Sequence, residues 1–198
     1  MDAYTVRSAV LRGASAVPVS VEVSAGSGLP GITIIGMADT MVHEARSRVR
    51  VALGQCGFEM PRGSVTVNLA PGDVKKTGTG LDLPIAVAIL ACTGQIPKEG
   101  LDGCLLVGEL GLEGQVCPVR GTVAYAMLAA EQGLSLVRAD ERPHGWLISE
   151  KERPIGSIAQ LKQGVGRLGE STPERSARQA LLEVADDEGL DYGDVADQ

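Results

Sequence analysis

The stretch PGDVKKTGTGLDLPIAVAIL, residues 71 to 90, joins a glycine-rich loop to a long apolar run. The apolar run predicts a buried helix from Asp82 to about Thr93. Loops that open directly into a helix bind phosphates, carry nucleophiles, or simply turn the chain. The function of this loop therefore has to be inferred from its own residues and from the elements around it.

The loop combines features that attract an anion with features that repel one. Helix N-terminal amides together with Lys75 and Lys76 favour an anion. Asp82 disfavours an anion at this position, because its own carboxylate can cap the same helix N-terminal amides. Gly78 and Gly80 allow a sharp turn. The lysines precede the glycines and the sequence contains no G-x-x-x-x-G-K-[ST], so we predict no ATP-binding residues of the P-loop type in this chain.

Outward from the loop, the apolar periodicity predicts the remaining elements. Strands are expected at 5–11, 17–23, 32–35, 64–69 and 134–138, and helices at 39–55, 121–132 and 155–167. Residues 104–109 and 114–117 predict a hairpin. Strands come first, and helices and strands then alternate. The sequence therefore predicts an α/β (α+β) fold, a mixed β-sheet with packed helices.

The segment GSGLPG, residues 26 to 31, formally matches a dinucleotide-binding fingerprint. That fingerprint needs a helix after it, whereas a strand pattern, ITIIG, follows here, and Pro30 interrupts the motif. We interpret the segment as a turn between two strands.

Charge divides the chain at about residue 169. Residues 170–198 hold nine acidic residues and two arginines, which accounts for the whole net charge of −7. Residues 1–169 are neutral, so bulk charge does not favour nucleic-acid binding, although a local basic patch stays open. Because the later part is polar, acidic and broken by Pro173, we predict a domain at 1–168 and an acidic linker at 169–198.

The helix at 39–55, which Asp39 is predicted to cap, carries a basic strip opposite its apolar face. His43, Arg46 and Arg50 share this strip, while Arg48 points elsewhere and is placed to pair with Glu44. The strip is either a contact for phosphates or an acidic partner, or a solvated helix face.

The histidines and cysteines do not indicate a catalytic or metal site. The two histidines, His43 and His144, are isolated, so we predict no catalytic residues. The four cysteines form no C-x-x-C pair, so we predict no metal site and a reducing cytoplasmic location. The longest apolar run is too short to span a bilayer, so no membrane contact is predicted.

Residues 4 to 165 resemble the N-terminal domain of the YifB/ComM proteins, the magnesium-chelatase-related AAA+ ATPases of bacteria. The most specific pieces are GLPGITIIGMAD (28–39), VNLAPGDVKKTGTGLDLPIA (67–86) and VGELGLEGQV (107–116). The resemblance implies a Lon proteolytic-domain-like fold, shared with the second domain of a small-subunit ribosomal protein. It also implies that the acidic linker leads to an AAA+ module outside residues 1–198.

For the intact protein, the resemblance implies ATP and Mg²⁺ as cofactors, a homo-hexamer, and DNA branch migration during natural transformation. The chelatase label reflects the ATPase module and does not imply metal insertion into a porphyrin. Within this fragment, Arg46, Arg50, Lys75 and Lys76 are the candidates for contact with phosphate, DNA or a partner.

Lon-type peptidases use a Ser–Lys pair, with the serine in a loop of the form K-x-G-P-S-A-G. The matching run here is Lys76 to Asp82, KTGTGLD, which places Gly80 at the nucleophile position. Residues 118–130, where the lysine is expected, contain none. Gly78, Thr79, Gly80 and Asp82 therefore form a degenerate loop, and we expect a non-catalytic domain. Two alternatives stay open: a divergent peptidase that uses Thr79, and a stand-alone interaction domain with an acidic tail.

Overall fold

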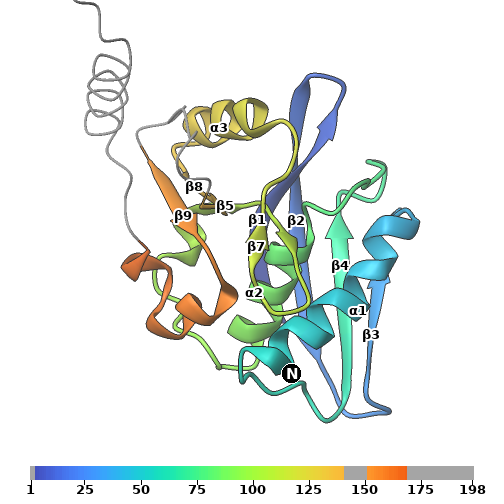
Figure 1. The fold of residues 1–198 in the computed structure, drawn as a ribbon. Coiled ribbons are helices and arrows are strands. Elements are labelled where there is room, and N and C mark those ends of the chain that lie inside the picture. The colour runs from blue at the N-terminus through green and yellow to red at the C-terminus, as the bar shows by residue number, and fades with distance from the viewer. Residues whose placement is uncertain (1–2, 141–150, 169–198) are drawn as a thin grey trace, which may run out of the picture.

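The computed structural model describes residues 3–140 and 151–168, which form helices on both faces of one sheet (Figure 1). The sheet has seven strands in the order β3-β4-β2-β1-β5-β8-β9. Pairs β1–β2 and β2–β4 are antiparallel, and the other four pairs are parallel. The predicted mixed sheet with packed helices is confirmed, whereas the Lon-like fold stays a prediction.

The strand bounds are β1 Ala3–Arg12, β2 Ser15–Ala25, β3 Gly31–Ile35, β4 Ser64–Ala70, β5 Cys104–Leu106, β6 Glu109–Leu110, β7 Val116–Cys117, β8 Ser135–Ala139 and β9 Glu152–Ile155. Within the described residues, the α-helices are α1 Thr40–Gln55, α2 Asp82–Cys92 and α3 Thr122–Glu131, and the short 3-10 helices are η1 Leu101–Gly103, η2 Ile158–Gln163 and η3 Val165–Arg167. The glycine-rich segment at 26–30 joins β2 to β3, which confirms that it is a turn between strands.

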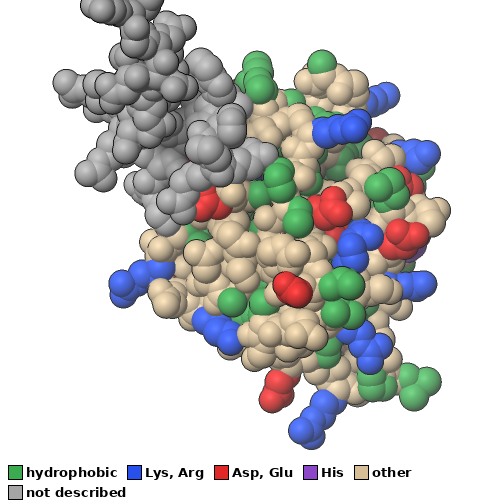
Figure 2. Space-filling model, viewed as in Figure 1, with side chains coloured by type: hydrophobic (Ala, Val, Ile, Leu, Met, Phe, Trp, Pro, Cys, Tyr) green, Lys and Arg blue, Asp and Glu red, His purple; other side chains and the backbone are tan. Residues whose placement is uncertain are grey.

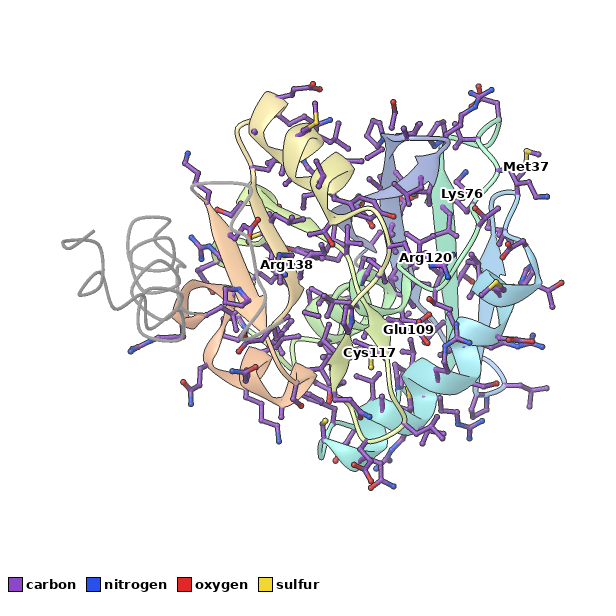
Figure 3. All side chains as sticks on the ribbon, turned by 45° about the horizontal axis from the view of Figure 1, so that its top comes forward. Met37, Lys76, Glu109, Cys117, Arg120 and Arg138 are labelled. Carbon is purple, nitrogen blue, oxygen red and sulfur yellow. The ribbon has the colours of Figure 1, made fainter. Side chains whose placement is uncertain are left out.

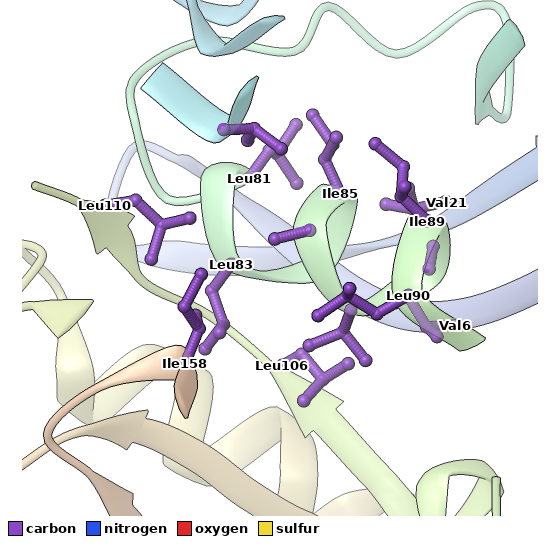
Figure 4. Close-up of a cluster of buried hydrophobic side chains, with 14 of the residues drawn as sticks. Val6, Val21, Leu81, Leu83, Ile85, Ile89, Leu90, Leu106, Leu110 and Ile158 are labelled. Atoms are coloured by element: carbon purple, nitrogen blue, oxygen red, sulfur yellow. The ribbon is translucent and has the colours of Figure 1, made fainter. Parts of the chain in front are cut away.

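Helix α2 forms the centre of the larger core. Residues 82–91 are all buried, which explains why this helix is apolar on every side rather than amphipathic. In Figure 4, Ile89 lies near Val21 of β2, and Leu83 lies next to Ile158 and close to Leu110. Full burial of each such side chain contributes about 1.5–3 kcal/mol. The predicted helix is therefore confirmed as the element on which the sheet, α1 and the β6–β7 hairpin converge.

The two faces of the sheet carry separate cores. Leu106 of β5 belongs to the cluster around α2, whereas its neighbour Leu105 packs with Tyr125 and Ala129 of α3. Successive residues of a strand point to opposite faces, so one strand serves both cores. Helix α3 covers the face opposite to α2.

Helix α1 begins at the predicted cap. The carboxylate of Asp39 accepts a hydrogen bond from the amide of Val42 at 2.9 Å. The buried face is Val42, Ala45, Val49, Ala52 and Leu53, which agrees with the apolar spacing. The predicted pairing of Arg48 with Glu44 is also confirmed, at 3.7 Å.

Two element predictions were wrong. Residues 104–109 do not form one arm of a hairpin: β5 joins the main sheet between β1 and β8, and the hairpin consists of β6 and β7. The break comes at Gly108, whose amide leaves the sheet to donate to the carbonyl of Gly80. The last helix, expected at 155–167, is instead the end of β9 followed by η2 and η3. Ser157 caps η2 as in a helix, but Gly164, with a φ of 84°, ends it.

None of the helices in the described ranges is long and apolar enough to cross a bilayer. The predicted linker at 169–198 and the isolated His144 lie outside the described residues.

Candidate functional site

The loop before α2 is fixed to the residues before α1. Lys76 pairs with this segment: its amide donates to the carbonyl of Met37 at 3.1 Å, and its carbonyl accepts from the amide of Asp39 at 3.0 Å. Figure 3 shows Lys76 beside β4 and Met37 near the outer edge of the molecule. Met37 has a φ of 54°, a left-handed conformation that is unfavourable for a residue with a side chain. The pairing with Lys76 compensates for that cost.

The side chain of Lys76 is fully buried, which corrects the expectation that it belongs to an exposed basic set. Its amine donates to the carbonyl of Pro71, inside the same loop. Burial lowers the pKa of the Lys76 amine, and the nearby charge of Asp73 only partly offsets this effect. In this conformation Lys76 is a structural residue of the loop and offers no charge to a phosphate.

The N-terminal end of α2 is occupied by the protein's own backbone. The amide of Leu83 donates to the carbonyl of Gly108 at 3.0 Å, and the amide of Gly108 donates to the carbonyl of Gly80 at 3.0 Å. The amide of Asp82 donates to the carbonyl of Thr79 at 3.1 Å. The amides of Asp82 and Leu83 are among those that an anion at this helix end would need. The loop therefore does not fit a triphosphate.

Asp82 has a different role from the predicted cap. Its carboxylate accepts from Arg48 of α1 at 2.6 Å and 3.0 Å, and from the amide of Leu110 in β6 at 3.2 Å. The capping prediction for the α2 amides was wrong, because the carboxylate points away from them toward α1 and the hairpin. Asp82 thus joins α2, α1 and β6 through one buried group.

The Arg48–Asp82 pair sits at the margin of the core. Asp82 is 1% exposed and Arg48 is 20% exposed. Burial raises the pKa of the Asp82 carboxyl, although Arg48 acts in the opposite direction. The hydrogen bond to Asp82 raises the pKa of Arg48. Two parallel hydrogen bonds to a carboxylate make this a strong, geometrically specific ion pair.

Thr79 has a partner that the sequence did not reveal. Its hydroxyl donates to the carboxylate of Glu109 at 2.6 Å. Glu109 is paired with Cys117 in the β6–β7 hairpin, and Figure 3 shows these two residues close together. The contact fixes the loop to the hairpin, and it also gives the Thr79 hydroxyl a carboxylate that can accept its proton.

The nucleophile position predicted at Gly80 faces a small apolar space. A Cβ atom built there would lie 3.4 Å from Val107, 3.8 Å from Val119 and 3.8 Å from the hydroxyl of Tyr125. Burial raises the pKa of Tyr125, so the hydroxyl is protonated at neutral pH. A side chain at this position would find room, but its three nearest neighbours provide no base.

The other predicted basic residues are exposed. Arg46 and Arg50 lie on the outer face of α1, and Lys75 lies next to the segment that precedes this helix. On the face shown in Figure 2, basic and acidic side chains are interspersed rather than grouped into one continuous basic area. Among the described residues, no group of three or more His, Cys, Asp or Glu side chains could hold a metal ion.

Sequence reasoning missed both polar contacts of the loop. Arg48 lies off the basic strip of α1, and this offset was the one available signal that it contacts something other than solvent. Glu109 follows a buried strand in sequence, and nothing in its local pattern indicated that it reaches Thr79.

The fold and loop thus define an α/β domain in which a glycine-rich loop is closed by its own polar contacts. Residues 21–139 match the family described as Subunit ChlI of Mg-chelatase. This match covers more than half of the chain, which therefore belongs to the ChlI family of magnesium-chelatase-related proteins.

Three relatives illustrate this membership. The YifB protein of Escherichia coli is 43% identical over 65% of this chain and 26% of its own length. A protein of Mycobacterium tuberculosis is 32% identical over 90% of this chain and 37% of its own length. The competence protein ComM of Haemophilus influenzae is 31% identical over 100% of this chain and 40% of its own length. The chain therefore corresponds to less than half of these relatives.

Proposed function

We propose that this chain is a non-catalytic N-terminal domain of an ATP-dependent DNA-remodelling motor that promotes branch migration. The observation that carries the proposal is the similarity to the competence protein ComM over the whole chain, which accounts for 40% of that relative. In this proposal the ATP and Mg²⁺ site, and assembly into a hexamer, belong to the AAA+ part of the intact protein, which works in the cytoplasm.

The loop geometry supports a role without covalent chemistry. Gly80 has no side chain to act as a nucleophile, and its surroundings are Val107, Val119 and a protonated Tyr125. Lys76, the one lysine of the motif, is buried and bonded to the Pro71 carbonyl. The domain contributes a rigid surface rather than a reaction.

The first test is to read the source gene beyond the codon for Gln198. We expect a G-x-x-x-x-G-K-[ST] motif within a few dozen codons, because that motif binds the phosphates of ATP. A stop codon directly after Gln198 would contradict the motor and leave a stand-alone interaction domain.

The second test concerns DNA. We propose that Arg46, Arg50 and Lys75, the exposed members of the predicted set, contact DNA phosphates. In the intact protein, their combined replacement by glutamate should weaken DNA binding and reduce the slope of log K against log salt by about 0.9 for each lost contact with duplex DNA. Arg12→Glu, at the exposed end of β1, serves as a control for a charge reversal outside this set. An unchanged salt slope in the triple variant would remove these residues from the DNA interface.

A divergent peptidase is the second candidate, favoured by one contact. The Thr79 hydroxyl lies 2.6 Å from the Glu109 carboxylate, which is the distance expected between a nucleophile and its base. Hydrolysis of fluorescent casein that disappears in both Thr79→Val and Glu109→Gln would support this candidate. Absence of hydrolysis by the wild-type chain, or hydrolysis that survives Thr79→Val, would exclude it.

A further inference from the structure

A groove of about 490 Å³ lies at the far end of α2 from the loop, and the site described above does not use it. It is lined by residues 57–62, between α1 and β4, together with Thr93, Gln95 and Lys162. We call it the Phe58 groove. Its volume falls in the range of pockets that bind ligands or peptide side chains, about 300–1,000 Å³.

The walls of the Phe58 groove are held in place by the fold. The side-chain amide of Gln95 accepts from the amide of Glu59 at 2.7 Å and donates to its carbonyl at 2.8 Å. Phe58 is buried in the main core, and Met60 packs against the same core. The groove is therefore preformed, which lowers the entropic cost of binding an occupant.

Two cations flank this apolar floor. The amine of Lys162 lies 5.0 Å from the centre of the Phe58 ring, and Arg62 is exposed on the opposite segment. Glu59 is the one acidic side chain among the lining residues. The groove thus combines apolar contact with a net positive charge, which suits an acidic segment that also carries aliphatic residues.

The chain itself contains such a segment. Residues 180–188 read ALLEVADDE, with three branched aliphatic residues (Leu181, Leu182 and Val184), four acidic residues and no basic one. Residues 1–169 are neutral, so the acidic excess of the protein lies entirely in the part that follows them.

The connection is long enough for this segment to reach the groove. Leu168 follows Lys162 by six residues, so the two lie within about 21 Å of each other. The twelve residues from Leu168 to Ala180 span up to about 42 Å. A linker of this length gives an effective concentration in the millimolar range, so even a weak contact becomes populated.

We propose that the Phe58 groove binds segment 180–188 of the same chain. The aliphatic side chains occupy the floor formed by Phe58 and Met60, and the carboxylates face Arg62 and Lys162. Docking there fixes the direction in which the polypeptide leaves the domain, and this consequence does not depend on the proposed motor function.

Cross-linking on the full chain tests the contact directly. A carbodiimide joins an amine to a carboxylate without a spacer, and we expect it to link Lys162 to Glu183, Asp186 or Asp187. Arg62→Glu should lower the yield of this product, and Glu59→Gln should raise it. Lys98→Glu is the matched control, because Lys98 also lies over an aromatic ring, that of Tyr4, at 5.1 Å.

Amide hydrogen exchange gives an independent readout. We expect exchange in 180–188 to be about twofold slower in the wild type than in Arg62→Glu/Lys162→Glu, since a contact whose dissociation constant matches the millimolar effective concentration is about half formed. High salt should remove the difference.

Three results would overturn the proposal. The first is that Lys162 forms no cross-link to 180–188. The second is equal exchange rates in the groove variant and the Lys98→Glu control. The third is a cross-link that joins light and heavy copies in a mixture of ¹⁴N and ¹⁵N protein, which would place the segment in the groove of a second molecule.

Discussion

Asp82 is buried beneath α1, and the charge next to it comes from Arg48. Removing one partner of such a pair costs about 3–5 kcal/mol, because the other charge stays buried without compensation. We expect Arg48→Met to lower the free energy of unfolding toward this range, measured by urea denaturation. The double variant Arg48→Met/Asp82→Leu should recover part of the loss, because no buried charge is left.

The control for this pair is Arg46→Met, on the exposed strip of the same helix. Surface substitutions of this kind stay within about 0.5 kcal/mol. Equal effects of Arg48→Met and Arg46→Met would show that the Asp82 contact does not stabilise the fold.

The buried amine of Lys76 makes the free energy of unfolding depend on pH in the alkaline range. Because burial lowers the pKa of its amine in the folded state, the unfolded chain binds more protons between that pKa and the ordinary lysine value of about 10.4. The free energy of unfolding therefore rises with pH across this window. The contribution is fully present above the ordinary lysine pKa and is lost as the pH falls through the folded pKa. We expect Lys76→Met to flatten this rise, measured as the free energy of unfolding at a series of alkaline pH values below the ordinary lysine pKa.

The exposed neighbour Lys75 provides the matched control. Lys75→Met should leave the rise with pH unchanged, because that side chain is exposed in the structure. A wild-type stability that shows no more pH dependence than the Lys76→Met variant would contradict the buried state of Lys76.

Sequence reasoning at the residue scale succeeded where a cause was local. The Asp39 cap and the Arg48–Glu44 pair follow from spacings of three and four residues, and both are present. The contact between Asp82 and Arg48 joins residues that are 34 positions apart. The burial of Lys76 depends on the path of its loop, which returns the amine to the carbonyl of Pro71. Local patterns carry no information about such contacts.

Among the elements, β3 depends on one neighbour. It is the edge strand of the sheet and pairs with β4 alone. Gly36 directly follows it, with a φ of 106°, and a Cβ there would lie 2.1 Å from the carbonyl oxygen of Leu69. We expect Gly36→Ala to cost more than about 1 kcal/mol, because both the dihedral and the space exclude a side chain.

Hydrogen exchange locates this effect. The amides of β3 should exchange faster in Gly36→Ala than in the wild type, because the clash separates β3 from β4. Gly72→Ala is the control, since its Cβ would meet nothing within 4 Å. Unchanged exchange in β3 would show that the backbone adjusts at no cost.

Element prediction was most accurate where the apolar pattern was long. The run at 82–92 and the alternation in β2 were sufficient to identify those elements. The division between β5 and the β6–β7 hairpin was missed because Gly108 ends pairing by bonding to Gly80, a contact 28 residues away. The failed helix at 155–167 shows that a capping signal starts a helix but does not extend it past Gly164.

For the whole molecule, one buried hydroxyl joins the first strand to the second half of the chain. Ser8 donates to the carbonyl of Leu106 at 2.8 Å, linking β1 to β5. We expect Ser8→Ala to cost about 1 kcal/mol in the free energy of unfolding, since the hydrogen bond is lost in a buried setting. The control is Ser20→Ala, at a half-buried position of β2. This substitution should lower the free energy of unfolding by less than Ser8→Ala does.

Family membership and the mixed sheet were predictable because the quoted motifs extend across most of the domain. The Lon-like fold stays a prediction, since it rests on a resemblance to another family. The motor activity stays a prediction, since it belongs to parts of the protein that the described residues do not contain.

The order of the strands also bears on how the chain is made. β1 lies between β2 and β5, and its residue Arg7 pairs with Leu105. At about 5–20 residues per second, the ribosome takes about 5–20 s to synthesise the intervening residues. During that interval β1 has no β5 to pair with, so its edge of the β1–β2 hairpin is exposed. Exposed strand edges pair with other chains. Slower translation or a missing chaperone should therefore lower the yield of this domain through aggregation of nascent chains, before the native fold exists.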